Sequence, residues 1–133
     1  MSRRFADVRP GEELPELVVD ITTTLIVAGA IASRDYQDVH HDEALARERG
    51  TPGIFMNILT TNGLVGRFVT DWAGPDATVE RIAIRLGVPN FAGDTMRLTG
   101  RVTAAEQGVV EVEVAGRNRL GDHVTGTVTV ALP

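Results

Sequence analysis

The chain has 133 residues, 43% of them hydrophobic and 23% charged, which is typical of a single folded domain and argues against disorder. Its formal net charge of −5, with no basic tract, argues against nucleic acid or an anionic membrane as the main partner. Cysteine is absent, which excludes disulfides, thiolate metal sites and cysteine nucleophiles. No stretch reads as a signal peptide or a membrane span, so we expect a cytoplasmic protein.

The first fifty residues predict short elements around a polar loop. Residues 1–12 are polar, and we expect a flexible N-terminus there. Residues 13–22 predict a strand, and the acidic and threonine residues at 20–24 could cap a short helix that ends at Ser33. Residues 42–49 predict a second short helix that is closed by Gly50. The run Ser33–Glu43 lies between the two helices and is expected to be irregular.

Residues 53–72 predict the longest helix, because their apolar side chains recur with a period of about 3.6 residues. The opposite face is also partly apolar, so we expect this helix to be buried, with a sheet wrapped around it. Gly63 and Gly66 lower its intrinsic helix propensity and indicate close backbone packing.

After residue 77 the apolar pattern changes to a period of two residues. Residues 81–86, 95–102, 108–118 and 123–132 alternate in this way, and residues 117–122 predict a hairpin turn between the last two. Long half-buried strands joined by short turns form an antiparallel sheet with one face on a core. The sequence therefore predicts an α+β domain in which a curved antiparallel sheet holds one long helix.

The loop run and the start of the long helix resemble a known family. The segment Ser33–Asp42 matches the Ser-Gly-Asp-x-Asn-Pro-(aliphatic)-His-x-Asp signature of MaoC-like, (R)-specific enoyl-CoA hydratases, apart from Arg34 for glycine and Gln37-Asp38 for Asn-Pro. Five segments spread over the chain are similar, more narrowly, to the small catalytic subunits of actinobacterial steroid side-chain hydratases. The resemblance implies one hotdog domain over residues 1–133, paired into a dimeric hotdog unit.

The resemblance implies that Asp35 and His40 are the catalytic pair, which activates a water molecule and transfers its proton. Residues five apart diverge on a regular helix, but in a loop that folds back they can meet around one water molecule. Histidine titrates near neutral pH, and an adjacent carboxylate can orient its ring. Which of the two residues takes the base role is left open by the sequence.

Other residues have weaker expectations. The resemblance implies that a backbone amide at Asn57 is the oxyanion donor, in place of the family's glycine, while the Asn57 side chain could add a donor of its own. It also implies that Val88, Pro89 and Phe91 shape the acyl pocket, which Tyr36 could also line. His41 and His123 are expected to be structural, and Asp38 and Asp42 to form a turn and a helix cap. We expect no metal site, because adjacent side chains such as those of residues 40–42 project apart.

The function implied by the resemblance is hydration of a 2-enoyl-CoA with a bulky, steroid-derived acyl group. Coenzyme A would be part of the substrate, and no cofactor is expected. The expected partner is a second copy or a second MaoC-like chain in a heterotetramer. Two alternatives remain, since one fold serves several reactions: a hotdog thioesterase, and a non-catalytic MaoC-like subunit that completes a partner's site. Six arginines are candidates for CoA phosphates: Arg81, Arg85, Arg97, Arg101, Arg117 and Arg119.

Overall fold

The computed structural model describes all 133 residues and contains three α-helices and five strands. The helices and the two 3₁₀ turns are η1 (Phe5–Asp7), α1 (Thr23–Ala32), η2 (Asp38–His40), α2 (Glu43–Glu48) and α3 (Ile58–Ala73). The strands are β1 (Leu17–Asp20), β2 (Thr78–Leu86), β3 (Thr95–Glu106), β4 (Val109–Asn118) and β5 (Gly121–Ala131). No helix of the structure is both long and apolar enough to cross a bilayer.

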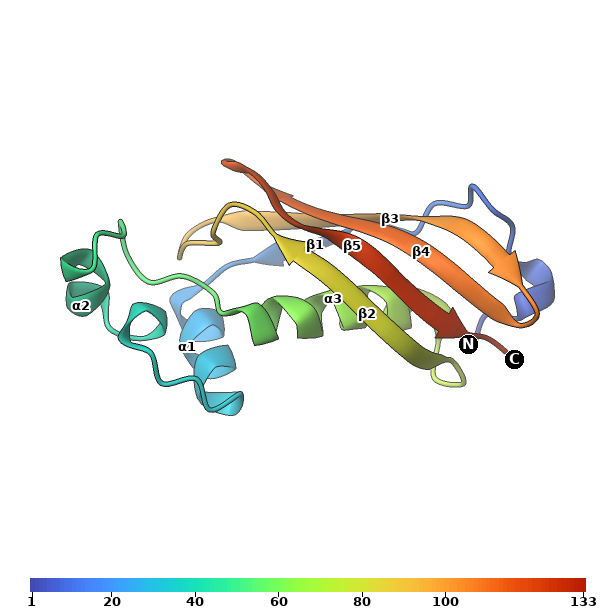
Figure 1. Cartoon of the computed structure of the whole chain (residues 1–133), viewed down its shortest axis with the longest axis horizontal. Helices are drawn as coiled ribbons and strands as arrows, with labels where there is room; N and C mark the ends of the chain where they lie inside the picture. The colour runs from blue at the N-terminus through green and yellow to red at the C-terminus, as the bar shows by residue number, and fades with distance from the viewer.

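The five strands form one antiparallel sheet in the order β1-β3-β4-β5-β2. Helix α3 runs along one face of this sheet, while α1 and α2 lie together at the end of the molecule opposite to the two chain termini (Figure 1). Three of the strand pairs contain a register shift, and such bulges increase the local twist that curves a sheet. The predicted α+β hotdog architecture, a curved antiparallel sheet around one long helix, is therefore confirmed.

The core lies between α3 and the sheet. Alternate residues of β3, β4 and β5 point inward, as the period of two residues predicts, and they meet the buried face of α3. The fully buried side chains on these elements include Val65 and Val69 from α3, Leu98 and Val102 from β3, Val112 from β4 and Val128 from β5.

Helix α3 begins at Ile58, five residues later than the sequence predicts. The Asn57 side chain caps the helix by accepting a hydrogen bond from the Thr60 amide. The preceding segment is extended, because Phe55 forms a β-bridge with Phe91 and the Met56 amide donates to the Asn90 carbonyl at 3.0 Å. This later start leaves Ile58 about half exposed, where the predicted periodicity placed it on the buried face.

The N-terminal segment packs against the rest of the domain, which differs from the expected flexibility of residues 1–12. The Arg3 amide donates to the Ala73 carbonyl, the Phe5 amide to the Pro133 carbonyl, and Val8 is only 3% exposed. Glu12 accepts hydrogen bonds from both Arg3 and the indole of Trp72. The segment is anchored by main-chain hydrogen bonds, one buried valine and the side-chain contacts of Glu12.

Helices α1 and α3 meet at a glycine. A Cβ added to Gly29 of α1 would lie 2.1 Å from Oγ1 and 3.0 Å from Cγ2 of Thr60 on α3. Only glycine fits such an approach, since real contacts of this kind are never so short. In contrast, Gly63 has nothing within 4 Å of an added Cβ, and Gly66 meets only Ile82 at 3.3 Å. The close packing that the sequence suggested for α3 is therefore at Gly29 and not at Gly63.

His123 links three parts of the fold inside the core, on the interior strand β5 and not at a sheet edge. Its Nδ1 lies 2.6 Å from the Val88 carbonyl, and its Nε2 lies 2.8 Å from the Thr61 hydroxyl of α3. A carbonyl can only accept, so Nδ1 carries the proton of the neutral ring and Nε2 accepts from Thr61. Burial lowers the pKa of His123, because the charged imidazolium loses its hydration. The side chain joins the turn after β2 to the first turn of α3.

We predict that Gly29→Ala destabilises the fold while Gly63→Ala does not. The added methyl at position 29 must displace Thr60, which should lower the free energy of unfolding by about 1–3 kcal/mol. Gly63→Ala is the matched control. Nothing lies near a Cβ added there, so the higher helix propensity of alanine should raise the free energy of unfolding by up to about 1 kcal/mol. Urea denaturation measures both values. Equal effects at the two positions would contradict the close approach at Gly29.

We predict that stability falls as the pH drops below about 6.5, the ordinary pKa of histidine. The lowered pKa of His123 means that the unfolded chain binds this proton first, so stability is complete above that pH and is lost on acidification through the folded-state value. The difference in unfolding free energy between pH 7.5 and pH 5.5 should shrink in His123→Gln. The exposed His41→Gln is the control and should keep the wild-type difference; an unchanged difference in His123→Gln would refute the assignment.

Candidate active site

The end of α1 places Asp35 through a helix-terminating motif. The Asp35 amide donates to the Ala30 carbonyl at 2.9 Å and the Arg34 amide to the Ile31 carbonyl at 3.0 Å. These two bonds form a Schellman motif, in which the residue after the C-cap is left-handed, and Arg34 has a φ of 56°. Glycine takes this conformation freely, whereas arginine does so at a cost of about 1–2 kcal/mol. Arg34 therefore adopts a left-handed conformation that the family's glycine would adopt at no cost.

His40 closes the short turn η2 and is held by the segment before α3. Its Nδ1 lies 2.7 Å from the Phe55 carbonyl, and its ring packs edge-on against the Phe55 ring with centroids 5.0 Å apart. Because the carbonyl only accepts, Nδ1 carries the proton of the neutral ring. The lone pair of that neutral ring is then on Nε2, which faces Asp35.

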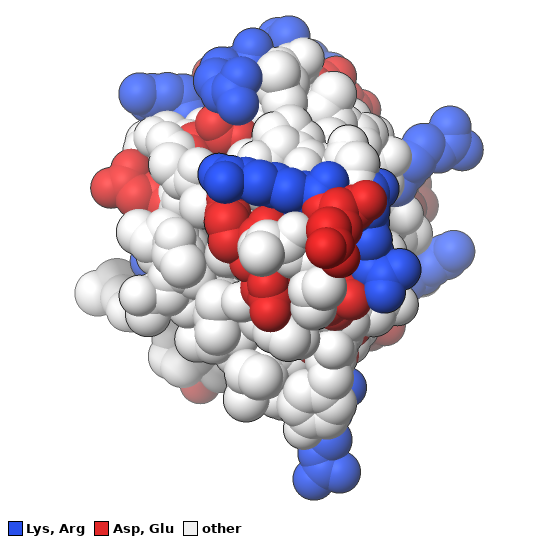
Figure 2. Space-filling view, turned by 90° about the vertical axis from the view of Figure 1, so that its left-hand side faces the viewer, with Lys and Arg blue, Asp and Glu red and all other residues white.

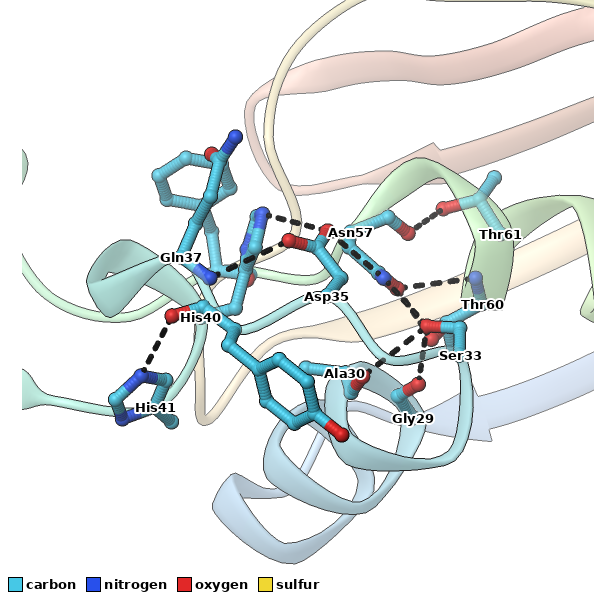
Figure 3. Close-up of polar contacts among 12 residues, drawn as sticks. Gly29, Ala30, Ser33, Asp35, Gln37, His40, His41, Asn57, Thr60 and Thr61 are labelled. Atoms are coloured by element: carbon cyan, nitrogen blue, oxygen red, sulfur yellow. Dashed lines mark hydrogen bonds and ion pairs between the residues drawn. The ribbon is translucent and has the colours of Figure 1, made fainter.

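The two predicted catalytic side chains meet. Oδ2 of Asp35 lies 3.4 Å from Nε2 of His40, and the side chains are 23% and 8% exposed, respectively. Figure 3 shows them directed toward each other, from the end of α1 and from η2, beside the first turn of α3. The polar loop thus folds back as the spacing of five residues requires, with one side of the pair still reached by solvent.

Asn57 lies against this pair and is almost fully buried, at 2% exposure. Its Nδ2 lies 3.1 Å from Asp35 Oδ2 and 2.9 Å from the Ser33 hydroxyl oxygen. Its Oδ1 accepts from the amide of Thr60 at 3.1 Å and from the Thr60 hydroxyl at 2.6 Å. The resemblance aligned Asn57 with the start of the family's central helix, and Asn57 is the N-cap residue of α3, with its side chain facing Asp35 inside the protein.

The start of α3 also presents unpaired main-chain donors. The amides of Asn57, Ile58 and Leu59 form no hydrogen bond, while the next amide, of Thr60, is capped. Free N–H groups and the helix dipole favour negative charge at this position. These amides and the pair formed by Asp35 and His40 lie at the same end of α3.

The expected pocket residues fall into two groups. Phe91 belongs to the site's support, because its ring packs edge-on against Phe55 with centroids 6.1 Å apart, and Phe55 contacts His40. Val88 and Pro89 lie on the turn behind, where the carbonyl of Val88 binds His123 and that of Pro89 binds Asn118. The structure does not bring these two residues into contact with the pair.

Tyr36 lies on the outer side of the loop and is 64% exposed. It lines an open depression of about 610 Å³ together with His41 and Arg49, and neither Asp35 nor His40 belongs to that depression. A role in the pocket, which the sequence left open for Tyr36, is therefore not supported within this chain.

The remaining polar residues of the loop have separate partners. His41 Nε2 lies 3.1 Å from the Tyr36 carbonyl, on the side away from Asp35 (Figure 3), and Asp42 caps α2 through the Leu45 amide. The residues at 40–42 thus project apart, as expected, and the structure contains no cluster of three or more metal-ligating side chains.

Asp38 stands where the family has proline, at the first position of η2. A proline fits there because it lacks an N–H, and the Asp38 amide forms no hydrogen bond. Its carboxylate instead binds Arg49 at 2.6 and 2.8 Å, and the hydrogen bond from this guanidinium lowers the pKa of Asp38. The Asp38–Arg49 pair ties the loop to the end of α2.

Acidic and basic groups interleave over this end of the molecule (Figure 2), so it presents no uniformly basic surface.

The six arginine candidates divide by their partners. Ion pairs engage Arg97 with Glu16, Arg117 with Asp122, and Arg119 with Asp94. The other three arginines form no ion pair and are exposed: Arg81, Arg85 and Arg101. The paired side chains contribute to the fold, and only the second group has unengaged guanidinium groups.

Two residues of the site were missed as contributors by the sequence analysis. Ser33 donates to the Gly29 carbonyl at 2.7 Å and accepts from Asn57, and Thr60 binds the other end of the Asn57 amide. Ser33 belongs to the family signature, so a signal for it was present in the sequence. Thr60 gave no signal, because its role depends on how α1 and α3 cross.

Comparison with known proteins supports the same reading of the fold. The MaoC-like domain model matches residues 6–131. The chain is 53% identical over 122 residues to the 3-oxo-4,17-pregnadiene-20-carboxyl-CoA hydratase beta subunit of Mycobacterium tuberculosis, covering 92% of this chain and 95% of that protein. It also matches a chain in the crystal structure of the ChsH1-ChsH2 complex from Mycobacterium tuberculosis, with a TM-score of 0.92 and 52% identity over 94% of this chain and 98% of the other.

A more distant structure shares the fold alone. The R-hydratase PhaJ1 from Pseudomonas aeruginosa in the unliganded form has a TM-score of 0.90 at 20% identity, covering 98% of this chain and 85% of that chain. The family match extends over almost the whole sequence, and the signature loop brings its aspartate and histidine together as that family's motif implies. The chain belongs to the MaoC-like domain family.

Proposed function

We propose that the protein is an enoyl-CoA hydratase, a lyase that adds water reversibly across the 2,3 double bond of an acyl-CoA thioester. The observation that carries the proposal is the approach of Asp35 Oδ2 to His40 Nε2, at 3.4 Å, beside unpaired amides at the start of α3. Hydration needs a base for water, a proton for the α-carbon and a donor for the thioester oxygen. The pair and the unpaired amides are our candidates for these three roles.

The pair can bind and activate one water molecule. Both facing atoms, Oδ2 of Asp35 and Nε2 of the neutral His40 ring, are acceptors, so a water molecule can donate one O–H to each. As the water oxygen bonds to the β-carbon, one of its protons passes to the pair and the π electrons of the double bond move toward the thioester carbonyl. The pair then returns a proton to the α-carbon and ends in its starting protonation state.

The negative charge that develops on the thioester oxygen needs donors, and the unpaired main-chain amides near Asn57 are placed to supply them. The side chain of Asn57 does not take this role, because both of its N–H groups are bound to Ser33 and Asp35. The oxyanion donor is therefore assigned to the backbone, where the N–H survives the replacement of the family's glycine.

The proposed substrate is a steroid-derived enoyl-CoA. Support comes from the 53% identical relative, which is named as a 3-oxo-4,17-pregnadiene-20-carboxyl-CoA hydratase subunit. In the compound of that name the 17-ene joins carbon 17 to carbon 20, the carbon that carries the thioester carbonyl, which makes it a conjugated enoyl thioester. Addition of water changes no oxidation state overall, so the reaction requires no redox cofactor, and coenzyme A enters as part of the substrate. We place the protein in the cytoplasm with such substrates.

The proposed assembly contains a second MaoC-like chain, in a heterotetramer, or a second copy. The 53% identical relative is named as a hydratase beta subunit, and the 52% identical solved chain is part of the ChsH1-ChsH2 complex. Within this chain, Ile58 and Leu59 are 51% and 53% exposed next to Asn57, and the outer side of β2 is an unpaired sheet edge. Exposed apolar side chains beside a site and an open edge both favour a covering partner.

We predict that Asp35→Asn and His40→Gln each reduce the hydration rate by about 10²–10⁴-fold, the usual contribution of a general acid or base. Loss of the conjugated-thioester absorbance of a steroid enoyl-CoA measures the rate, in the presence of the partner chain. His41→Gln is the control and should keep the wild-type rate, since it lies next to His40 but faces Tyr36. Release of free CoA without hydration would favour a thioesterase, and full activity of both variants would reject the site.

We predict that Ile58→Glu weakens assembly while the chain remains folded. Position 58 is the first residue of α3, where an acidic side chain is favoured by the helix dipole and is about half exposed in the isolated chain. Burial of that carboxylate against a partner would be unfavourable. Light scattering after size exclusion, with and without a co-expressed MaoC-like chain, measures the mass. Wild-type chain that stays monomeric in both cases would contradict the proposed assembly.

A further inference from the structure

We infer that the side chain of Asn57 is a positioning group, which holds the Asp35 carboxylate in the orientation that faces His40. The inference deepens the proposed hydratase function and rests on it for its kinetic consequence. It assigns to Asn57 a task that the glycine found at this helix position in the family cannot perform, because glycine has no side chain.

The orientation of the Asn57 amide is fixed by a main-chain donor. The Thr60 N–H can only donate, so the atom 3.1 Å from it must be the carbonyl oxygen Oδ1, and the NH₂ group must face the other way. That direction contains the Asp35 carboxylate and the Ser33 hydroxyl, both of which have lone pairs to accept. The assignment of oxygen and nitrogen in this amide is therefore unambiguous.

All four hydrogen-bonding positions of the amide are used. Its two N–H groups reach Ser33 and Asp35, and the two lone pairs of Oδ1 accept from the amide and the hydroxyl of Thr60. At 2% exposure no water competes for these positions. A buried amide that is fully satisfied in one arrangement has no alternative rotamer of similar energy.

The partners of the amide are themselves held. The Ser33 hydroxyl donates to the Gly29 carbonyl at 2.7 Å, so its proton is engaged and its oxygen is left to accept. Thr60 is packed against Gly29 where α1 and α3 cross. The position of Asp35 therefore depends on how α1 and α3 cross. Gly29 contacts both Ser33 and Thr60, and these two residues hold the Asn57 side chain that binds Asp35.

The contact selects one oxygen of Asp35. Asn57 binds Oδ2, the same oxygen that lies 3.4 Å from His40 Nε2. The other oxygen, Oδ1, accepts only one long hydrogen bond, at 3.4 Å, from the Gln37 amide. Without the Asn57 donor the carboxylate, at 23% side-chain exposure, is free to rotate toward solvent. Displacement of a reacting group by about 1 Å can cost about 10²-fold in rate.

The kinetic test separates positioning from helix capping. Asn57→Ser retains a good N-cap residue but has no group that reaches Asp35, and Asn57→Gly retains only the backbone amide. Both should lower kcat by about 10–100-fold with KM changed less than about 3-fold, while Asn57→Ser, which keeps a helix cap, should lose less Tm than Asn57→Gly. Thr22→Gly is the matched control, since it removes the corresponding cap of α1 far from the pair, and its kcat should be unchanged. An Asn57→Ser variant with wild-type kcat would overturn the inference.

A second measurement needs no activity, so it remains informative even if the hydratase proposal fails. The Asn57 side-chain NH₂ should give two separate proton resonances in ¹⁵N spectra of the wild-type protein in complex with its partner, both slow to exchange with solvent. Asp35→Ala should shift one of the two strongly and leave the other, bound to Ser33, nearly in place. A pair that exchanges like a free amide, or that ignores Asp35→Ala, would show that the contact is absent in solution.

Discussion

The site depends on the crossing of α1 and α3 at Gly29 and Thr60, where the helices approach too closely for any side chain larger than hydrogen. This crossing sets the end of one helix against the start of another, so a C-terminal turn that delivers Asp35 lies beside an N-terminal turn that offers free amides. A polar loop alone would leave both groups in water with many conformations. The packing of two helix ends converts a local sequence motif into a fixed arrangement of charge and donors.

The sequence predicted which helices and strands form more accurately than it predicted where they begin and which residues they bring into contact. Periodicities located four of the five strands and the long helix, and the signature singled out Asp35 and His40, which the fold brings to within 3.4 Å of each other. The start of α3 was placed too early, because an extended apolar segment such as Ile54–Met56 has the same composition as a buried helical turn. The roles of Thr60 and of the Asn57 side chain were beyond reach, since both arise from contacts between residues that only the tertiary fold brings together.

The departures from the family signature become intelligible as backbone requirements. Arg34 and Asp38 stand at a left-handed position and at the first residue of a 3₁₀ turn, two places where glycine and proline are favoured but not obligatory. Neither position demands glycine or proline, and Asp38 adds an ion pair with Arg49 at the end of α2. The loop geometry therefore rests on hydrogen bonds of the main chain more than on the identity of its side chains.

The ring of His40 is oriented by the carbonyl of Phe55, and a carbonyl belongs to every amino acid. Substitutions at position 55 can consequently alter the shape and volume next to the imidazole without reversing its tautomer, provided that the extended segment keeps its place against Phe91 and Asn90. The orientation of the imidazole and the volume beside it are thereby uncoupled at this point of the fold. Such a separation offers a physical route by which one scaffold could diverge toward thioesters of very different bulk while its reactive pair stayed intact.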